Sequence, residues 1–250
     1  MQTKQNDMNP HEAQAALAWL IEMGADEIVG EEPVNRFVVA PPVVIAPASK
    51  VEPARAAPST AEACNTLEDL QSTLLALENF PLKKTASNLC FASGNFLADI
   101  MVIGDVPGRD EDIEGRVFAG QNALLLEKML GAIGLSSGGV SLFNFIPWRP
   151  PGNRTPTEAE IQLCQPFLLR AIELCSPKFI LCLGGQSAQR LSGKSEGLLA
   201  LRGKWFDLKA SKKKIPVLAS FHPSYLLKQA SQKRLAWRDL LLFKEAIDAD

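Results

Sequence analysis

Two short segments of this sequence place polar side chains directly after apolar, strand-like runs. Residues 104–108 (GDVPG) supply a carboxylate and a glycine turn and lead into the acidic run 110–112. Residues 221–225 (FHPSY) carry the only histidine of the part that we expect to be globular. Ligands of an open parallel sheet bind at the carboxyl ends of its strands. Carboxylates and an imidazole at two such ends therefore predict a catalytic cleft.

Other predicted strand ends and a loop add an amide, a glycine-rich turn and an aromatic ring. Asn144 ends one apolar run, residues 184–187 (GGQS) follow another, and Phe118 lies in the loop 115–120 (GRVFAG). An amide suits the edge of a flat heterocycle and an aromatic ring suits its face. With a carboxylate to position a water or stabilise a sugar cation, these groups fit cleavage of an N-glycosidic bond. Taken alone, each also fits a structural role, as a core ring or a side chain that satisfies loop backbone.

The elements that must position these groups alternate between strands and helices. Apolar runs predict four strands, at residues 98–103, 140–146, 178–183 and 215–220. Helices are predicted at 67–77, 121–133, from 187, and at 231–247. A further helix runs to about residue 174, with Thr155 as N-cap, Pro156 first and Glu158 completing a capping box. This alternation predicts a three-layer α/β/α fold around a four-stranded parallel sheet.

The rest of the chain predicts appendages to that domain. Residues 1–32 contain an amphipathic helix at 9–24, which we expect to be a docking element for a protein partner, such as a polymerase clamp. Residues 33–64 are rich in proline and alanine and predict a flexible linker, so the catalytic domain is expected at 65–250.

The net charge of −2 gives no sign of a nucleic-acid binder taken as a whole. From Arg202 to Arg238, however, the sequence contains ten basic residues and one acidic residue, Asp207. This excess of positive charge predicts a positive face where phosphates could bind. The run 209–214 alone also fits a solvated lysine-rich loop.

The five cysteines form no CxxC pair, and the sequence shows no signal peptide or membrane-spanning run. We therefore expect free thiols and a reduced, cytoplasmic monomer with no membrane contact.

Four motifs in order make the chain similar to a known family. Residues 104–108, 115–120, 148–156 (WRPPGNRTP) and 221–227 (FHPSYLL) together resemble the uracil-DNA glycosylase superfamily. The nearest branch is family 4, whose members typically carry an iron–sulfur cluster. The resemblance covers the chain from about Leu67 to its end.

The resemblance implies a role for each matching residue. Phe118 would stack on the flipped base, Asn144 would bind the uracil edge beside Gly104, and His222 would face uracil O2. Asp105 and Glu111 would handle the water or the sugar cation, while Asp110 and Asp112 are expected to be an exposed acidic turn. The segment 222–227 would press into the minor groove. The implied DNA contacts are Arg149, Arg154, Ser224, Tyr225, Leu226 and Lys228.

Two departures from the family pattern stand out. Asp105 replaces the usual glutamate and is one methylene shorter. The four cluster positions hold Leu77, Phe80, Trp148 and Cys164, so only one thiol remains where four thiolates are needed. We therefore expect no cofactor and no metal, with Phe80 and Trp148 filling the volume of the cluster.

These observations favour a monofunctional DNA repair enzyme that flips uracil, hydrolyses its N-glycosidic bond and leaves an abasic site. One alternative is a glycosylase for other deaminated bases, such as hypoxanthine or xanthine. Another is a catalytically weak DNA-binding protein that recruits repair partners through residues 1–64. A generic nucleotide-binding domain is disfavoured, because the 104–108 turn lacks the phosphate-loop pattern and its lysine.

Overall fold

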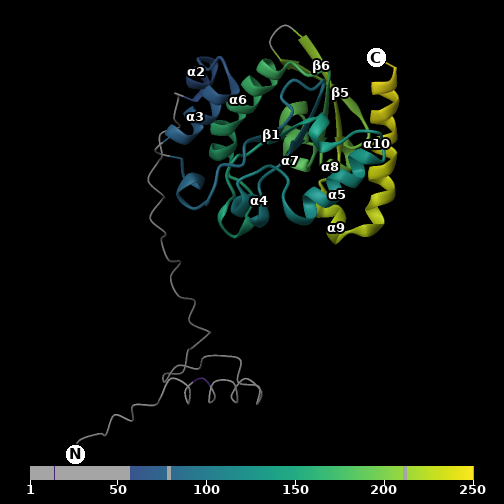
Figure 1. Ribbon diagram of the computed structural model, residues 1–250, viewed down its shortest axis with the longest axis horizontal. Helices are drawn as coiled ribbons and strands as arrows, with labels where there is room; N and C mark the ends of the chain where they lie inside the picture. Colours follow the sequence, from purple (N-terminus) through teal and green to yellow (C-terminus); the bar gives the residue numbers. More distant parts are fainter. Residues whose placement is uncertain (1–13, 15–56, 78–79, 211–212, 250) are drawn as a thin grey trace, which may run out of the picture. The chain divides into compact units, whose positions relative to one another are not determined.

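The computed structural model describes residues 14, 57–77, 80–210 and 213–249 (Figure 1). The chain divides into two compact units, residues 1–51 and 52–250. The sheet and the candidate site lie in the second unit. The predicted helix at 9–24 lies outside the described residues apart from Gln14, which is helical. In the described part of the chain, no helix is long and apolar enough to cross a membrane.

A six-stranded sheet forms the centre of the second unit. Its strands run in the order β1-β3-β2-β4-β6-β5, with the inner four parallel and the two edge strands antiparallel. The four predicted strands are the inner four, so the sheet has two strands more than expected. The strands are β1 (Ala92–Gly94), β2 (Ile100–Gly104), β3 (Ser141–Asn144), β4 (Phe179–Leu183), β5 (Trp205–Ala210) and β6 (Lys213–Ser220).

Helices cover both faces of the sheet, which confirms the three-layer prediction. On β2, Met101 and Ile103 join the core beneath α2 (Ala57–Glu62), α3 (Leu67–Ala76) and α6 (Glu158–Cys175). The alternate residues Ile100 and Val102 join the core beneath α5, α9 and α10. Continuous apolar strands are expected when both faces of a parallel sheet are buried. The remaining helices are α4 (Arg109–Glu114), α5 (Gly120–Gly131), α7 (Gly185–Ser192), α8 (Leu198–Leu201), α9 (Pro223–Lys228) and α10 (Lys233–Asp248).

The linker prediction is wrong at its C-terminal end. Residues 57–62 form α2, and Ala61 and Cys64 are buried against the core that contains α6. Alanine favours helix, and here it does so next to an apolar surface that it can cover. The folded unit therefore begins before the predicted boundary at residue 65.

The N-terminus of α6 lies two residues later than predicted. Thr157, not Thr155, is the N-cap: its hydroxyl accepts from Glu160 N, while Glu160 accepts from Thr157 N at 2.7 Å. Both threonines precede a glutamate by three residues, so the sequence offers two capping boxes. The box of Thr157 and Glu160 has a further contact, because the guanidinium of Arg154 donates one hydrogen bond to each oxygen of the Glu160 carboxylate.

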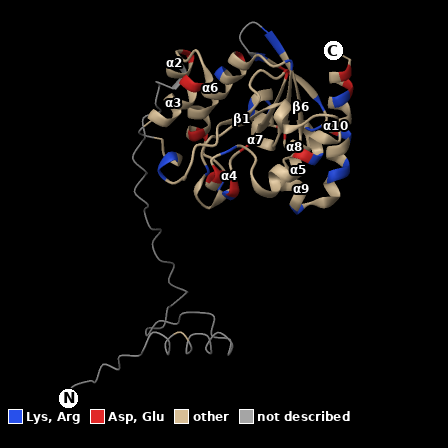
Figure 2. Ribbon diagram, viewed as in Figure 1, with Lys and Arg blue, Asp and Glu red and all other residues tan. Residues whose placement is uncertain are grey.

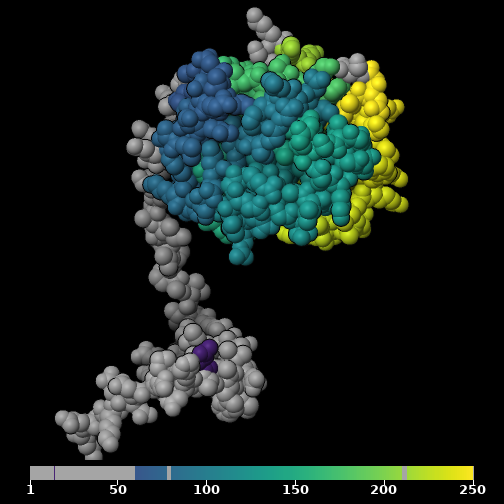
Figure 3. Space-filling view, viewed as in Figure 1, coloured from purple at the N-terminus to yellow at the C-terminus, as the bar shows by residue number. Residues whose placement is uncertain are grey.

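Register brings the predicted strand ends to one edge of the sheet. Gly104 lies opposite Asn144, and Leu183 lies opposite Ser220 two residues before His222. The space-filling view shows this unit with α2 and α3 on one side, the middle of the chain across the front and α10 on the other side (Figure 3).

Candidate active site

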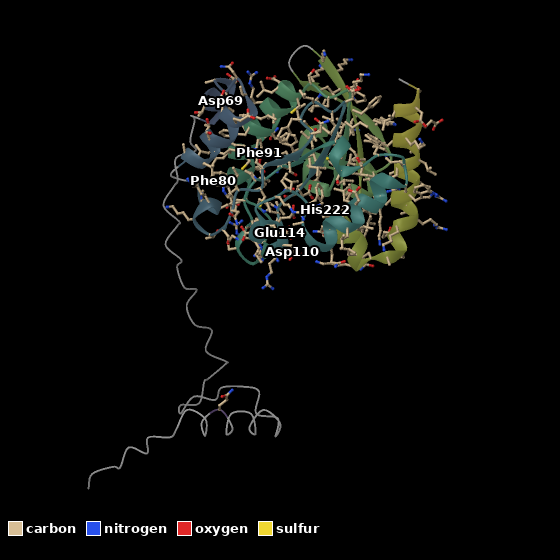
Figure 4. All side chains as sticks on the ribbon, in the orientation of Figure 1. Asp69, Phe80, Phe91, Asp110, Glu114 and His222 are labelled. Carbon is tan, nitrogen blue, oxygen red and sulfur yellow. The ribbon has the colours of Figure 1, made fainter. Side chains whose placement is uncertain are left out.

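Gly104 forms the floor of a small convergence of side chains at this edge. A methyl group on Gly104 would lie 2.7 Å from Asn144 Oδ1, 3.1 Å from Phe118 Cζ and 3.5 Å from His222 Nε2. An amide, an aromatic ring and an imidazole therefore meet over a residue that has no side chain. Figure 4 shows His222 on the same lower side of the unit as Asp110 and Glu114 of α4.

Two of the polar atoms that face this spot have no protein partner. Among the described residues, only three buried side-chain oxygen or nitrogen atoms lack a hydrogen bond. Asn144 Oδ1 and His222 Nε2 are two of the three. Buried polar groups are nearly always paired, so an acceptor and a ring nitrogen left open side by side indicate a missing ligand.

Asn144 is held in one orientation by two acceptors. Its amide nitrogen donates to the Cys90 carbonyl and to Glu111 Oε1, each at 3.2 Å. Because both neighbours can only accept, the nitrogen must face them and the oxygen must face the point over Gly104 where the three side chains converge. We call this point the pocket. Asn144 therefore offers a ligand an acceptor only.

Glu111 lies behind Asn144 and is almost fully buried. Its Oε1 also accepts from Phe118 N at 2.8 Å, and its Oε2 accepts from Gly108 N at 2.8 Å. Three N–H groups therefore compensate this buried charge, as burial of a carboxylate requires. In this arrangement Glu111 supports two walls of the pocket from a position that is only 1% exposed.

Phe118 adopts a backbone conformation that L-residues rarely use, with φ at +54°. Such strain persists only where the surroundings impose it. Here the hydrogen bond from Phe118 N to Glu111 helps to hold the turn. The ring lies nearly parallel to the His222 imidazole, at a centroid distance of 5.4 Å and an angle of 21°. The fold thus places an aromatic ring beside the two unpartnered atoms.

His222 is the N-cap of α9, and its ring nitrogens have separate roles. Nδ1 accepts from Ser224 N at 3.2 Å and lies 2.7 Å from the Ser224 hydroxyl. An Nδ1 that accepts a backbone N–H leaves the proton of a neutral imidazole on Nε2. Burial lowers the pKa of His222 below its ordinary 6.5, although the negative charges of Asp105 and Glu111 act in the opposite direction. His222 therefore directs a neutral N–H donor into the pocket.

Asp105 lies at the N-terminus of α7. Its Oδ1 accepts from the Ser187 backbone N–H at 2.8 Å and from the Ser187 hydroxyl at 2.5 Å, and its Oδ2 accepts from Gln186 N at 3.3 Å. A methyl group on Gly184 would lie about 2.2 Å from this carboxylate, so only glycine lets the helix approach. A carboxylate has about four lone-pair sites, and three donors leave one on the Oδ2 side for a water.

The predicted DNA-contacting segment forms the short helix α9, not a loop. Tyr225, Leu227 and Lys228 are exposed, and Ser224 is half-buried beside His222. Leu226 is 1% exposed and packs beneath α5 and α10, so its prediction as a DNA contact is wrong. An α-helix that lies on a core must turn part of its surface inward, and Leu226 occupies that part.

The residues of the predicted basic face and of the predicted acidic turn lie in different parts of the fold. Lys213 and Lys214 begin β6 and so lie at the opposite end of that strand from His222 (Figure 2). Asp110 is exposed as predicted, but Asp112 is buried and accepts from Ser87 N and Asn88 N, which corrects its prediction as an exposed turn residue. Arg149 donates to Asn153 and lies 3.9 Å from Asp112.

The four positions that match the cluster ligands all belong to one hydrophobic core. Phe80 and Trp148 are each 2% exposed, and their ring centroids are 4.6 Å apart. Leu77 packs against the same core, which also contains Cys164. Burial, with the nearby charge of Glu160, raises the pKa of the Cys164 thiol well above its usual range. Aromatic rings and one protonated thiol do not fit an iron–sulfur cluster, which needs thiolate ligands.

Sequence reasoning did not assign the supporting contacts around the site. The Cys90 carbonyl and the Ser187 hydroxyl fix Asn144 and Asp105, yet backbone carbonyls carry no sequence signal and serine is common in turns. The sequence pattern places Ser187 at the edge of the sheet that carries the site, but it does not predict the contact of Ser187 with Asp105.

The chain is similar in sequence to known proteins. Residues 91–241 match the sequence model of the uracil DNA glycosylase superfamily. The chain is 34% identical over 166 residues to the type-4 uracil-DNA glycosylase of Archaeoglobus fulgidus, covering 65% of this chain and 83% of the relative. It is 36% identical over 173 residues to that of Saccharolobus solfataricus (67% and 80%) and over 163 residues to that of Thermotoga maritima (64% and 83%). These matches identify the chain as a member of the uracil-DNA glycosylase superfamily, in its type-4 branch.

Proposed function

We propose that this protein hydrolyses the N-glycosidic bond of uracil in DNA and leaves an abasic site. The observation that carries the proposal is the pair of unpartnered buried atoms over Gly104, Asn144 Oδ1 and His222 Nε2. A uracil offers the complements of both atoms on one edge, since its N3–H donates and its neighbouring O2 accepts. A base reaches such a pocket only when it is flipped out of the stack.

The reaction breaks the bond between the base N1 and the sugar C1′. As the bond lengthens, positive charge grows on the sugar and negative charge on the base, where O2 carries much of it. The neutral His222 Nε2–H donates to that oxygen, and a donor already in place lowers the barrier without a proton transfer. Water then gives its oxygen to C1′, and its proton ends on the departed base.

Asp105 acts on the sugar side of the same step. Its remaining lone pair orients the water, and its negative charge stabilises the cation at C1′. The Ser187 contacts keep this shorter carboxylate in place at the N-terminus of α7. Glu111 serves as a positioning residue, because its hydrogen bonds hold Asn144 and the Phe118 turn.

No step of this reaction passes through an iron–sulfur cluster. We propose that the packed pair of Phe80 and Trp148 replaces the cluster as a structural element, since buried aromatic rings bring apolar area and specific packing.

DNA would approach the edge of the sheet that carries α9. There the exposed Tyr225 and Leu227 can press on the duplex, and Lys228 can pair with a phosphate. Ser224 lies beside His222 and completes this contact face.

The acceptor-only Asn144 also favours a second candidate function, the removal of other deaminated bases. Deamination changes a ring acceptor into a ring N–H donor, both in cytosine (to uracil) and in adenine (to hypoxanthine). Because both amide hydrogens of Asn144 are already used, Asn144 tests for that donor alone. Xanthine carries such a donor as well.

The test is single-turnover cleavage of labelled oligonucleotides that contain one uracil, hypoxanthine or cytosine, with wild type and Asn144→Ala. Wild type should release uracil and leave an alkali-labile strand, cytosine should remain intact, and the variant should lose the reaction. Asn144→Asp is a poor probe, because it would set a second carboxylate about 3.2 Å from Glu111. DNA binding by wild type without cleavage of any oligonucleotide would instead support the recruitment protein.

A further inference from the structure

A buried ion pair lies outside the pocket, between α8 and α10. Arg202, at the end of α8, donates through Nε to Asp239 Oδ2 at 3.0 Å and through Nη2 to Asp239 Oδ1. The same Nη2 donates to the Leu235 carbonyl at 2.7 Å. Asp239 is fully buried and the Arg202 side chain is 15% exposed. Arg202 therefore belongs to the interior, although the sequence placed it in a positive face.

This pair is tied to β6, the strand that ends two residues before His222. The Ser220 hydroxyl donates to Asp239 Oδ2 at 2.7 Å, and Ser220 is the last residue of β6. Next to Arg202, Gly203 N donates to the Ala219 carbonyl at 2.9 Å. Helices α8 and α10 both pack on β6 (Figure 1). The backbone just before His222 is thus held from two helices.

The pair is also linked, through Phe221 before His222, to Tyr225 after it. The Arg202 guanidinium carbon lies 5.4 Å from the centroid of the Phe221 ring. The Phe221 ring in turn stacks on Tyr225, with centroids 5.1 Å apart and an angle of 21°. The Arg202 guanidinium, the Phe221 ring and the Tyr225 ring therefore stack in series, from the buried pair to a partly exposed side chain on α9. His222 lies between Phe221 and that helix.

A buried ion pair is weak evidence for a stabilising role. Well-packed apolar residues in its place are often as stable, because they avoid the cost of removing two charges from water. The directional contacts of a guanidinium and a carboxylate instead fix geometry. At this place the geometry that they fix is that of residues 220–225.

We propose that Arg202 and Asp239 are positioning residues for the reaction: through Ser220 and Phe221 they fix His222 Nε2 over the pocket and Tyr225 on the DNA face. The inference rests on the proposed function. Neither side chain touches the base, so the pair acts only through the residues that it holds. A displacement of about 1 Å at a reacting group can cost on the order of 100-fold in rate.

The main test replaces the pair by apolar residues, in the double variant Arg202→Met/Asp239→Leu. The matched control is Lys244→Met/Asp248→Leu, which removes an exposed pair on the same helix. Each protein is examined by urea unfolding, by binding to an undamaged duplex and by single-turnover cleavage of a uracil oligonucleotide. Tyr225 is the only tyrosine of the chain, so 3-fluorotyrosine labelling gives one ¹⁹F signal that reports on α9.

We expect the double variant to keep the wild-type urea midpoint and duplex affinity, to cleave about 10- to 100-fold more slowly, and to show a shifted or broadened ¹⁹F signal. The control should match wild type in all four measurements. Wild-type cleavage and an unchanged ¹⁹F signal in the double variant would overturn the proposal.

A second variant covers the case in which the double variant unfolds. Ser220→Ala removes only the hydroxyl that joins β6 to Asp239, so it should fold, slow cleavage and shift the His222 imidazole resonances. Wild-type rate and resonances in Ser220→Ala would then refute the inference. If wild type itself fails to release uracil, the proposed function has failed. The resonances of Tyr225 and His222 still decide whether the pair positions them.

Discussion

Replacing His222 separates its two ring nitrogens, because each makes a different contact. In His222→Ala both contacts are lost: the Nε2–H donor in the pocket and the Nδ1 acceptor that caps Ser224 N. In His222→Asn the amide oxygen can still accept from Ser224 N, because asparagine is a favoured N-cap. Its shorter side chain does not reach the position of Nε2. The two variants should therefore be equally impaired in cleavage but differ in stability.

The magnitudes follow from these contacts. Loss of one donor that stabilises a developing anion costs about 100- to 1000-fold in rate, or about 2.7–4 kcal/mol. Loss of a helix cap costs about 1 kcal/mol of unfolding free energy. We expect both variants to cleave about 100- to 1000-fold more slowly in single turnover. We expect only His222→Ala to lose the capping energy.

The assay measures single-turnover cleavage, urea unfolding and affinity for an undamaged duplex on the same preparations. Duplex affinity should stay near wild type in both variants, because the proposed role of His222 concerns only the flipped base. Cleavage by His222→Asn within tenfold of wild type would refute the assignment of Nε2 as the donor. An equal loss of cleavage and of DNA binding would refute the view that His222 acts on the transition state.

Three other predictions follow from the pocket and the packed cluster site. Gly104→Ala should abolish uracil release and cost about 1–3 kcal/mol of unfolding free energy, because its methyl lies 2.7 Å from Asn144 Oδ1; kinetics and urea unfolding test both, and wild-type release would contradict the pocket. Burial lowers the pKa of His222, so below the ordinary 6.5 the unfolded chain takes up a proton before the folded protein does. The contribution of His222 to stability should be complete above pH 6.5 and decline as the pH is lowered further, while cleavage persists until the lower pKa of the folded protein is reached. Profiles of stability and rate between about pH 5 and 8 check this. A cleavage rate that, on lowering the pH, decreases before pH 6.5 is reached would oppose it. Because Phe80 and Trp148 pack where thiolates are needed, protein purified without oxygen should be colourless and free of stoichiometric iron by metal analysis, and an iron-loaded preparation would contradict this.

Continuous apolar runs were sufficient to predict the core of the fold. The four parallel strands are continuous apolar runs, which is the pattern of a sheet buried on both faces. The edge strands β1 and β5 were missed because they have weaker signals. Strand β1 is three residues with the sequence ASG, and β5 mixes apolar and charged residues. Helix α4 differs from the predicted turn, since its acidic first turn lacks an apolar stripe.

For the site, the sequence predicted which residues meet but not how they share contacts. Gly104, Asn144, Phe118 and His222 do converge, because the ends of parallel strands share one edge. The burial of Leu226 and the ion pair of Arg202 depend on which helix packs above each residue, and no local pattern encodes that packing. Glu111 gave an acidic signal that fits either a catalytic or a supporting group, and its burial and its hydrogen bonds to Asn144 and Phe118 N favour the supporting role.

The hydrogen bonds of Glu111 have a consequence for how this pocket can change. One carboxylate holds both Asn144, the group proposed to bind the edge of the base, and the turn of Phe118, whose ring is proposed to stack on its face. Substitutions on the two walls should therefore be energetically coupled, and double-mutant cycles between Asn144 and Phe118 should depart from additivity. That coupling should vanish when Glu111 is replaced. A change of base preference would then require coordinated substitutions on both walls, so single substitutions should lower activity before they alter specificity.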